Sequence, residues 1–181
     1  PFPIKSATPE AKVRSVSAGS SFTCIITHSY EVWCAGTNQY GQLGDASSTN
    51  RQSFVKTQFS SGTKIVAIDS GESHTCAILA AGDVQCWGYG STGQLGDGNT
   101  TSRTTPVKAT ELPANRTAVS LSLSYDNSCA LLDDGNISCW GSNSYTKSDS
   151  PTFPANRTAV AIATGNVQTC AVLDDGQVTC W

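Results

Sequence analysis

The sequence predicts an all-β protein, a β-propeller built of four-stranded antiparallel blades, with three blades and part of a fourth in this chain. Three observations predict this fold class. A segment with paired cysteines occurs four times, and its first cysteines, Cys24, Cys76, Cys129 and Cys170, lie 52, 53 and 41 residues apart. Periods of about 40 to 50 residues with several short strands are typical of propeller blades. No window has the apolar periodicity of an amphipathic helix.

The repeats divide the chain into a lead-in and four blade units. The lead-in is 1–12, and the units are 13–64, 65–117, 118–158 and the partial unit 159–181. Each unit opens with an apolar strand, and a bend and a second strand with the first cysteine follow. After a tight turn, a third strand carries the second cysteine. Polar stretches rich in Ser, Thr, Asn and Pro, such as 104–109, are mostly long enough for a fourth strand and a loop.

The two cysteines of each copy are separated by nine residues. A three-residue hairpin loop favours Gly at its third position, where Gly82, Gly135 and Gly176 stand. This turn places the cysteines opposite one another at a site where Cα atoms are about 4.5 Å apart, which permits a disulfide. We therefore predict the disulfides Cys24–Cys34, Cys76–Cys86, Cys129–Cys139 and Cys170–Cys180. The first copy has His28-Ser29-Tyr30 in its loop, without Gly, so this argument leaves its turn type open.

Zinc is the rival interpretation of the cysteines. Structural zinc sites favour about two to four residues between paired cysteines, so a spacing of nine does not fit. The only histidines, His28 and His74, have no ligand-like partner. Each disulfide closes a short loop and contributes about 2–3 kcal/mol. Because disulfides persist in oxidising compartments, we expect a secreted or cell-surface protein.

Composition excludes two classes of partner. The net charge is −3 and only 14% of residues are charged, whereas phosphate binding needs clustered Lys and Arg, so we expect no nucleic acid. No apolar stretch reaches the roughly 18 residues of a membrane helix. The chain opens with Pro1-Phe2-Pro3 and contains no Met, so we expect a processed or excerpted segment whose signal peptide lies outside it.

The segment HTCAILAAGDVQCWGYGSTGQLGDG, residues 74–98, resembles the regulator-of-chromosome-condensation repeat, in which Trp-Gly is followed by Gly-Gln-Leu-Gly. The Gly-Gln-Leu-Gly motif also stands at 41–44, and the resemblance covers nearly the whole chain. It implies a propeller, seven-bladed in the best-known members. The first copy departs from the pattern, with Trp33 before Cys34 and Ala35 after it. The third copy reads SNSYTKSDSP at 142–151 instead of the motif, and the fourth ends at Trp181.

Three blades and part of a fourth cannot close a seven-bladed ring. We expect either a fragment of a longer chain, which we favour, or closure by association with copies of the same chain.

We expect no catalytic, cofactor-binding or metal-binding residues. Asp133-Asp134 and Asp174-Asp175 stand where a type I turn favours Asp, so we interpret them as turn residues. The segment 97–101 lacks the alternating acidic ligands of a calcium loop. His74 beside Cys76 is a strand residue in this interpretation, and Trp87, Trp140 and Trp181 are packing residues between blades.

Four sequons are candidate N-glycosylation sites: Asn99, Asn115, Asn136 and Asn156. Pro-Ala-Asn-Arg-Thr occurs twice, at 113–117 and 154–158, just before successive blades. If the source is eukaryotic, Asn115 and Asn156 are the first candidates and carry N-glycans at equivalent positions. In the alternative interpretation this sequence is only an inter-blade turn.

The leading hypothesis for function is a non-catalytic extracellular propeller, a protein-interaction or structural module of a surface or secreted assembly. The expected partners are other protein chains, either copies of itself or the rest of a longer chain. An alternative is a secreted propeller that binds and inhibits an enzyme, as some propellers similar to this family do. The family's guanine-nucleotide exchange on a small GTPase is less favoured, because it requires a cytosolic or nuclear setting.

Overall fold

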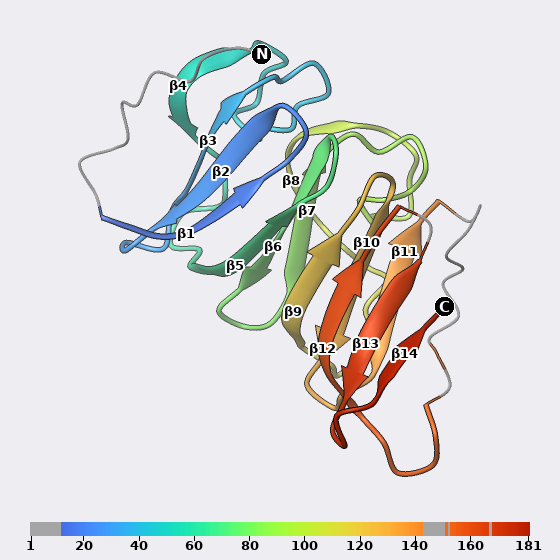
Figure 1. The fold of residues 1–181 in the computed structure, drawn as a ribbon. Helices are drawn as coiled ribbons and strands as arrows, with labels where there is room; N and C mark the ends of the chain where they lie inside the picture. Colours follow the sequence, from blue (N-terminus) through green and yellow to red (C-terminus); the bar gives the residue numbers. More distant parts are fainter. Residues whose placement is uncertain (1–11, 143–150, 152, 167) are drawn as a thin grey trace.

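The computed structural model describes residues 12–142, 151, 153–166 and 168–181, and every regular element among them is a β-strand. The strands form four antiparallel sheets that stand side by side, which confirms the predicted fold class (Figure 1). The predicted lead-in lies outside the described residues except for Lys12, and so does 143–150 of the third unit. In the described part of the chain, no helix is long and apolar enough to cross a membrane.

Each sheet follows the chain in simple meander order. The first contains β1 (Val13–Ala18), β2 (Phe22–Thr27), β3 (Val32–Gly36) and β4 (Arg51–Lys56). The second contains β5 (Ile65–Ser70), β6 (His74–Leu79), β7 (Val84–Gly88) and β8 (Arg103–Lys108). The third contains β9 (Ala118–Leu123), β10 (Asn127–Leu132) and β11 (Ile137–Gly141), and the fourth contains β12 (Ala159–Thr164), β13 (Thr169–Leu173) and β14 (Val178–Cys180).

The hairpin that joins the second and third strands has the turn expected from its sequence in the three sheets whose loop ends in Gly82, Gly135 or Gly176. Gly82 has φ +84°, and its N–H donates to the Leu79 carbonyl while the Leu79 N–H donates to Asp83. In the first sheet Tyr30 takes the same left-handed position, with φ +64°. The turn type therefore does not depend on glycine, although a non-glycine residue is strained there.

The structure joins the cysteines across these hairpins. Its disulfides are Cys24–Cys34, Cys76–Cys86, Cys129–Cys139 and Cys170–Cys180, each with Cα atoms 4.1 Å apart. The cysteines of the first two sheets are fully buried, whereas Cys180 is exposed. The first two disulfides are buried because the next sheet packs against them.

Each core cluster lies between two neighbouring sheets. The disulfide lies on one face of its sheet, and this face packs against the next sheet. The contacts from the next sheet come from the Ala and the Trp that directly follow its own two cysteines in sequence. Cys24, Ile26 and Cys34 thus pack with Ala77 and Trp87. The same positions form the next cluster, where Cys76, Ile78 and Cys86 meet Ala130 and Trp140. On the fourth sheet the corresponding face is open, and Val178 is 64% exposed.

The first strands of the sheets lie beside one another and are joined by polar side chains. The Leu123 N–H of β9 donates to Asp69 Oδ2 of β5 at 2.7 Å, and Ser17 Oγ of β1 donates to Asp69 Oδ1 at 3.3 Å. Between the third and fourth sheets, the Thr164 N–H of β12 donates to Ser122 Oγ of β9 at 2.8 Å. Burial raises the pKa of the Asp69 carboxyl. These contacts hold neighbouring blades in register along their first strands.

Candidate protein-interaction face

Tryptophan side chains fix the loops that follow β3 and β7. Trp87 Nε1 donates to the Gln42 carbonyl of the preceding blade at 2.9 Å, and Trp140 Nε1 donates to the Gln94 carbonyl at 3.0 Å. The last Gly of each Gly-Gln-Leu-Gly motif lies against the same indole. A Cβ on Gly96 would stand 2.8 Å from Trp140 Nε1. Each Gly-Gln-Leu-Gly motif therefore accepts a hydrogen bond from the tryptophan of the next blade and packs against its ring. We call this pair of contacts the clasp.

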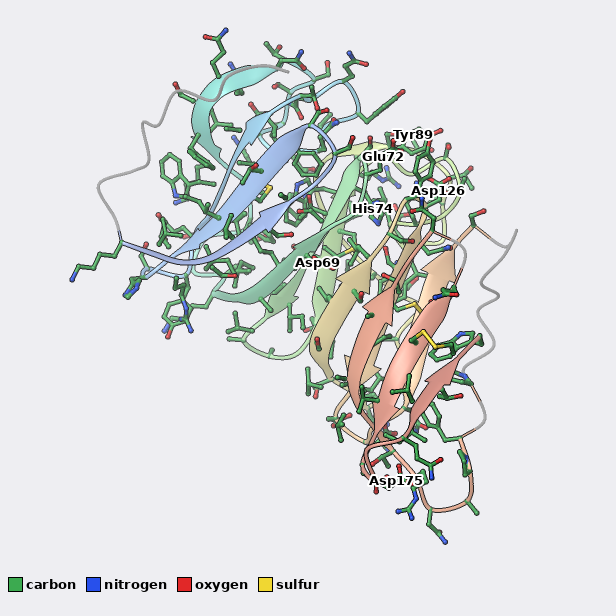
Figure 2. All side chains as sticks on the ribbon, in the orientation of Figure 1. Asp69, Glu72, His74, Tyr89, Asp126 and Asp175 are labelled. Atoms are coloured by element: carbon green, nitrogen blue, oxygen red, sulfur yellow. A yellow bond between two sulfur atoms is a disulfide. The ribbon has the colours of Figure 1, made fainter. Side chains whose placement is uncertain are left out.

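The turns between the first and second strands are also joined from blade to blade. The Ser20 N–H donates to the Glu72 carbonyl at 3.2 Å, and the Glu72 N–H donates to the Ser124 carbonyl at 3.3 Å. These bonds place Glu72 beside the turn that contains Tyr125 and Asp126. The clasped loops and the bonded turns lie at the same end of the blades (Figure 2).

Tyrosines and carboxylates from three blades meet at this end. We define the tyrosine face as Tyr40, Glu72, Tyr89, Tyr125 and Asp126. The rings of Tyr40 and Tyr89 lie 4.6 Å apart between centroids in a tilted arrangement. Tyr40 is 43% exposed and Tyr125 is 50% exposed, so aromatic surface faces solvent. Figure 2 shows Tyr89, Glu72 and Asp126 close to one another.

The charges of the tyrosine face interact. The Glu72 carboxylate beside Tyr125 raises the pKa of that phenol, chiefly through a hydrogen bond. Burial raises the pKa of Asp126, and the nearby Glu72 carboxylate adds to the rise. Gln94 Nε2 from the clasped loop donates to Asp126 Oδ1 at 3.0 Å. Carboxylates beside exposed tyrosine rings can attract a Lys or Arg side chain through charge and through cation–π contact.

The opposite end of the blades carries the hairpin loops, and there the predicted aspartate pairs are turn residues. Asp134 Oδ2 accepts from Arg116 Nε at 2.8 Å, and Asp175 Oδ2 accepts from Arg157 Nε at 3.0 Å. Figure 2 places Asp175 at the end away from Glu72 and Tyr89. Both arginines come from the two Pro-Ala-Asn-Arg-Thr segments. Each aspartate is therefore partnered by a nearby cation.

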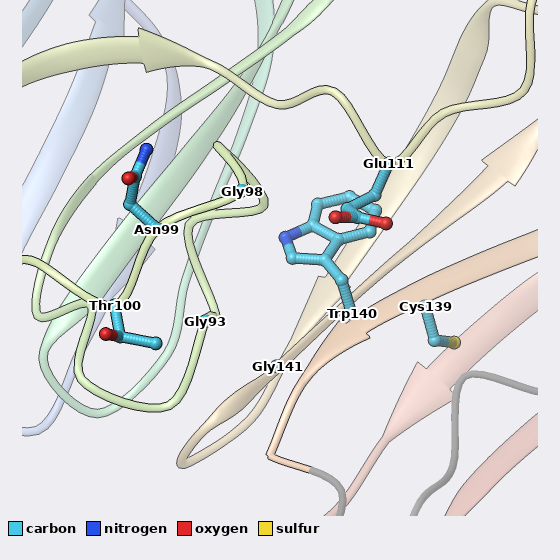
Figure 3. Close-up of a pocket in the computed structure, with 8 residues that line it drawn as sticks. All are labelled: Gly93, Gly98, Asn99, Thr100, Glu111, Cys139, Trp140 and Gly141. Carbon is cyan, nitrogen blue, oxygen red and sulfur yellow. The ribbon is translucent and has the colours of Figure 1, made fainter.

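The possible calcium loop is held by an ion pair instead. Arg103 donates to Asp97 Oδ2 from Nη2 at 2.6 Å and from Nε at 2.8 Å. Asn99 and Thr100 line a pocket of about 280 Å³ with Glu111 and Trp140 (Figure 3). Of the described residues that line this pocket, Glu111 alone carries a carboxylate. No group of three or more His, Cys, Asp and Glu side chains suited to a metal occurs in the described ranges.

His74 is fully buried between the second and third blades. Its Nε2 lies 2.8 Å from Ser128 Oγ, and Ser128 Oγ donates to the Gln94 carbonyl at 2.9 Å, so His74 carries its proton on Nε2. Nδ1 has no hydrogen-bond partner within the described structure. Burial lowers the pKa of His74 to about 3. A neutral imidazole that bonds the next blade is a packing residue, and its neighbour Cys76 is in a disulfide.

Sequence reasoning missed the tyrosine face. Tyr40 and Tyr89 stand at different positions of their repeats, as do Glu72 and Asp126, so alignment of the copies does not bring them together. The sequence signal for this face is limited to tyrosines and acidic residues in the predicted turns. The predicted residues Asn115 and Asn156 lie near Arg116 and Arg157, at the hairpin-loop end.

Comparison with family models gives a match over most of the chain. Two models of the "Regulator of chromosome condensation (RCC1) repeat" match, one at residues 13–42, 65–94 and 118–146 and the other at 31–78 and 81–131. The matched stretches contain the clasp tryptophans and both Gly-Gln-Leu-Gly motifs.

Among curated proteins, the chain is 34% identical over 110 residues to the ultraviolet-B receptor UVR8 of Arabidopsis thaliana, covering 61% of this chain and 25% of that protein. It is 31% identical over 131 residues to the X-linked retinitis pigmentosa GTPase regulator of Canis lupus familiaris, covering 71% and 13%. The chain therefore spans a quarter or less of these relatives.

Solved structures share the fold. Human WBSCR16 superposes with a TM-score of 0.86 at 22% identity, over 99% of this chain and 50% of that chain. Prp20p of Saccharomyces cerevisiae gives a TM-score of 0.79 at 23% identity, over 95% and 44%. The CRINKLY ectodomain of the Arabidopsis thaliana receptor kinase ACR4 gives a TM-score of 0.65 at 21% identity, over 95% and 54%.

Proposed function

The chain belongs to the regulator of chromosome condensation repeat family, and we propose that it is a non-catalytic extracellular module that binds another protein through the tyrosine face. The partner presents Lys or Arg side chains in an exposed segment. Propellers of this family act as protein-interaction modules, and this proposal assigns the binding surface and the chemistry of the partner.

The observation that carries the proposal is the tyrosine face itself. It combines half-exposed rings, which supply apolar contact area, with carboxylates that lie side by side. Tyrosine loses little rotamer freedom on binding and is enriched at interfaces. Because the clasps and turn bonds fix the loops, little ordering cost remains for binding.

The disulfides support the extracellular part of the proposal. Three of the four lie between packed blades, where Cys24, Cys76 and Cys129 are fully buried. The cytosol keeps thiols reduced, so hairpins of this kind favour an oxidising compartment. The exchange-factor alternative requires the opposite setting. Binding to an enzyme as an inhibitor would use the same face and differs only in the partner.

The test is a titration of the oxidised chain with an arginine–glycine peptide. Binding is monitored through the NMR chemical shifts of the backbone amides and the tyrosine rings. We expect shifts at Tyr40, Tyr89 and Tyr125 that weaken with added salt, since exposed charge pairs are screened. The same peptide with glutamate in place of arginine serves as the matched ligand and should not bind.

Paired variants locate the site. Glu72→Gln removes a carboxylate of the tyrosine face and should weaken arginine-peptide binding by about threefold to fivefold, as expected for an exposed ion pair. Glu111→Gln removes an exposed carboxylate that lies elsewhere and should leave binding unchanged. The proposal is overturned if the arginine peptide shifts residues outside the tyrosine face, if it does not bind, or if the two variants bind it equally.

A further inference from the structure

We propose that Asn115 and Asn156 carry N-glycans, so that the hairpin-loop end of the blades is covered while the tyrosine face stays bare. This inference rests on the proposed extracellular location but not on the proposed partner. Two observations support it: the conformation of the turns in which the two asparagines lie, and the absence from their side chains of the hydrogen bonds that Asn99 and Asn136 make in the described structure.

The two asparagines occupy the same backbone position in two copies of one turn. Asn115 and Asn156 each have φ +64°. The Arg116 N–H donates to the Pro113 carbonyl at 3.2 Å, and the Arg157 N–H donates to the Pro154 carbonyl at 3.1 Å. A positive φ at the third residue of such a turn is the type II pattern, which asparagine tolerates well. Each asparagine thus stands at the tip of a turn rather than in a strand.

Ion pairs tie each turn to the blade that follows it. Arg116, next to Asn115, bonds Asp134 Oδ2, and Arg157, next to Asn156, bonds Asp175 Oδ2. The chain then enters the blade through the Ala118 N–H, which donates to Gly82, and the Ala159 N–H, which donates to Gly135, both at 2.9 Å. A sugar on either asparagine would therefore be held at an equivalent position on successive blades.

Both sites are open to a large substituent. Each asparagine is exposed, and so is the threonine two residues later, Thr117 or Thr158. Within the described ranges neither asparagine side chain has a hydrogen-bond partner. A glycan on Asn115 or Asn156 therefore costs no contact of the folded chain.

The other two sequons differ on this point. Asn99 Nδ2 donates to the Asp97 carbonyl at 3.0 Å, and Asn136 Nδ2 donates to Asp134 Oδ2 at 2.9 Å. The middle residue of the Asn136 sequon, Ile137, is buried in β11. A glycan takes the place of one of the two Nδ2 hydrogens, so at either site it crowds a nitrogen that already donates a hydrogen bond within the folded chain. The structure thus ranks Asn115 and Asn156 above Asn99 and Asn136.

The modification is a transfer of an oligosaccharide from a lipid diphosphate by a membrane-bound transferase of the secretory route. A bond forms between the asparagine Nδ2 and the anomeric carbon, and the bond from that carbon to the phosphate oxygen breaks. The amide loses one proton, and the lipid diphosphate is the leaving group. The threonine of the sequon marks the acceptor.

The test is secretion of the chain from a eukaryotic cell and enzymatic release of N-glycans in heavy-oxygen water, which marks each occupied asparagine as labelled aspartate. We expect label at Asn115 and Asn156 in most molecules and little at Asn99 and Asn136. Unlabelled Asn115 and Asn156 in secreted, fully oxidised protein would overturn the proposal, and so would equal label at all four sites.

Matched variants keep the test independent of folding. Asn115→Gly removes the acceptor and suits the left-handed turn, so the glycan should disappear while the chain is still secreted. Thr117→Ser keeps the sequon and should keep the glycan. Retained glycan mass at this site in Asn115→Gly would also contradict the assignment. Arginine-peptide binding should be the same with and without glycans, so this result stands apart from the test of the tyrosine face.

Discussion

Trp87 joins two blades with one hydrogen bond and a fully buried ring. Trp87→Phe keeps most of the ring volume but leaves the Gln42 carbonyl without its indole donor. An unsatisfied buried polar group costs about 1–3 kcal/mol, so we expect the free energy of unfolding to fall by that amount in urea titrations. Trp33→Phe is the matched control, because Trp33 is only partly buried and contacts Glu31 of its own hairpin. A similar loss in both variants would contradict the clasp.

His74 makes stability depend on pH. Its pKa is about 3 in the folded chain against 6.5 for an unperturbed histidine. Its full contribution is therefore present above pH 6.5, and it decreases as the pH falls toward 3, because only the unfolded chain binds the proton. His74→Asn should be less stable near neutral pH but should lose less stability on acidification, by up to about 1.4 kcal/mol per pH unit. Parallel curves for the two proteins, measured by urea unfolding at several pH values, would refute this role.

At the scale of residues, the sequence predicts local chemistry better than contacts between blades. The spacing of Cys76 and Cys86 around a three-residue loop suffices to place them opposite each other. The role of Trp87 as a packing residue also follows from its recurrence. The tyrosine face could not be predicted, since Tyr40 and Tyr89 belong to two loops of different sequence and lie together only in the folded chain.

The hairpin turn is the element that sets the register of each blade. Gly82→Ala and Gly176→Ala both place a side chain at a left-handed φ, at +84° and +83°. That strain alone costs about 1–2 kcal/mol. A Cβ at 82 would also collide with Thr117 of the inter-blade turn, whereas a Cβ at 176 meets no atom within 4 Å in the described structure. We expect Gly82→Ala to lower the free energy of unfolding more than Gly176→Ala, and equal losses would show that the turn and the next blade are not in contact.

Strands and turns were predictable where glycine or cysteine marks them. The first hairpin shows the limit of that rule, because Tyr30 adopts φ +64° without the glycine that the other copies use. Its ring lies 4.5 Å from the Arg14 guanidinium carbon, a contact across strands that no local pattern contains. Tertiary contacts of this kind can offset the strain of a non-glycine residue.

At the scale of the molecule, one packing rule repeats from blade to blade: the disulfide face of each sheet is covered by the next. The fourth sheet leaves this face open, with Val172 and Val178 exposed. A further blade from a longer chain, or a second copy, would cover these valines. The two ends of the array also differ. One end carries the tyrosine face, and the other carries the hairpin turns whose aspartates pair with Arg116 and Arg157.

The central claim is a disulfide-linked propeller module that works in an oxidising compartment. Its most direct test is alkylation of the protein from its natural source, in denaturant and without reductant, followed by mass spectrometry. The account predicts no alkylated cysteine before reduction and all eight after it. Alkylated cysteines before reduction would contradict the extracellular assignment and would make the cytosolic exchange-factor alternative the better explanation.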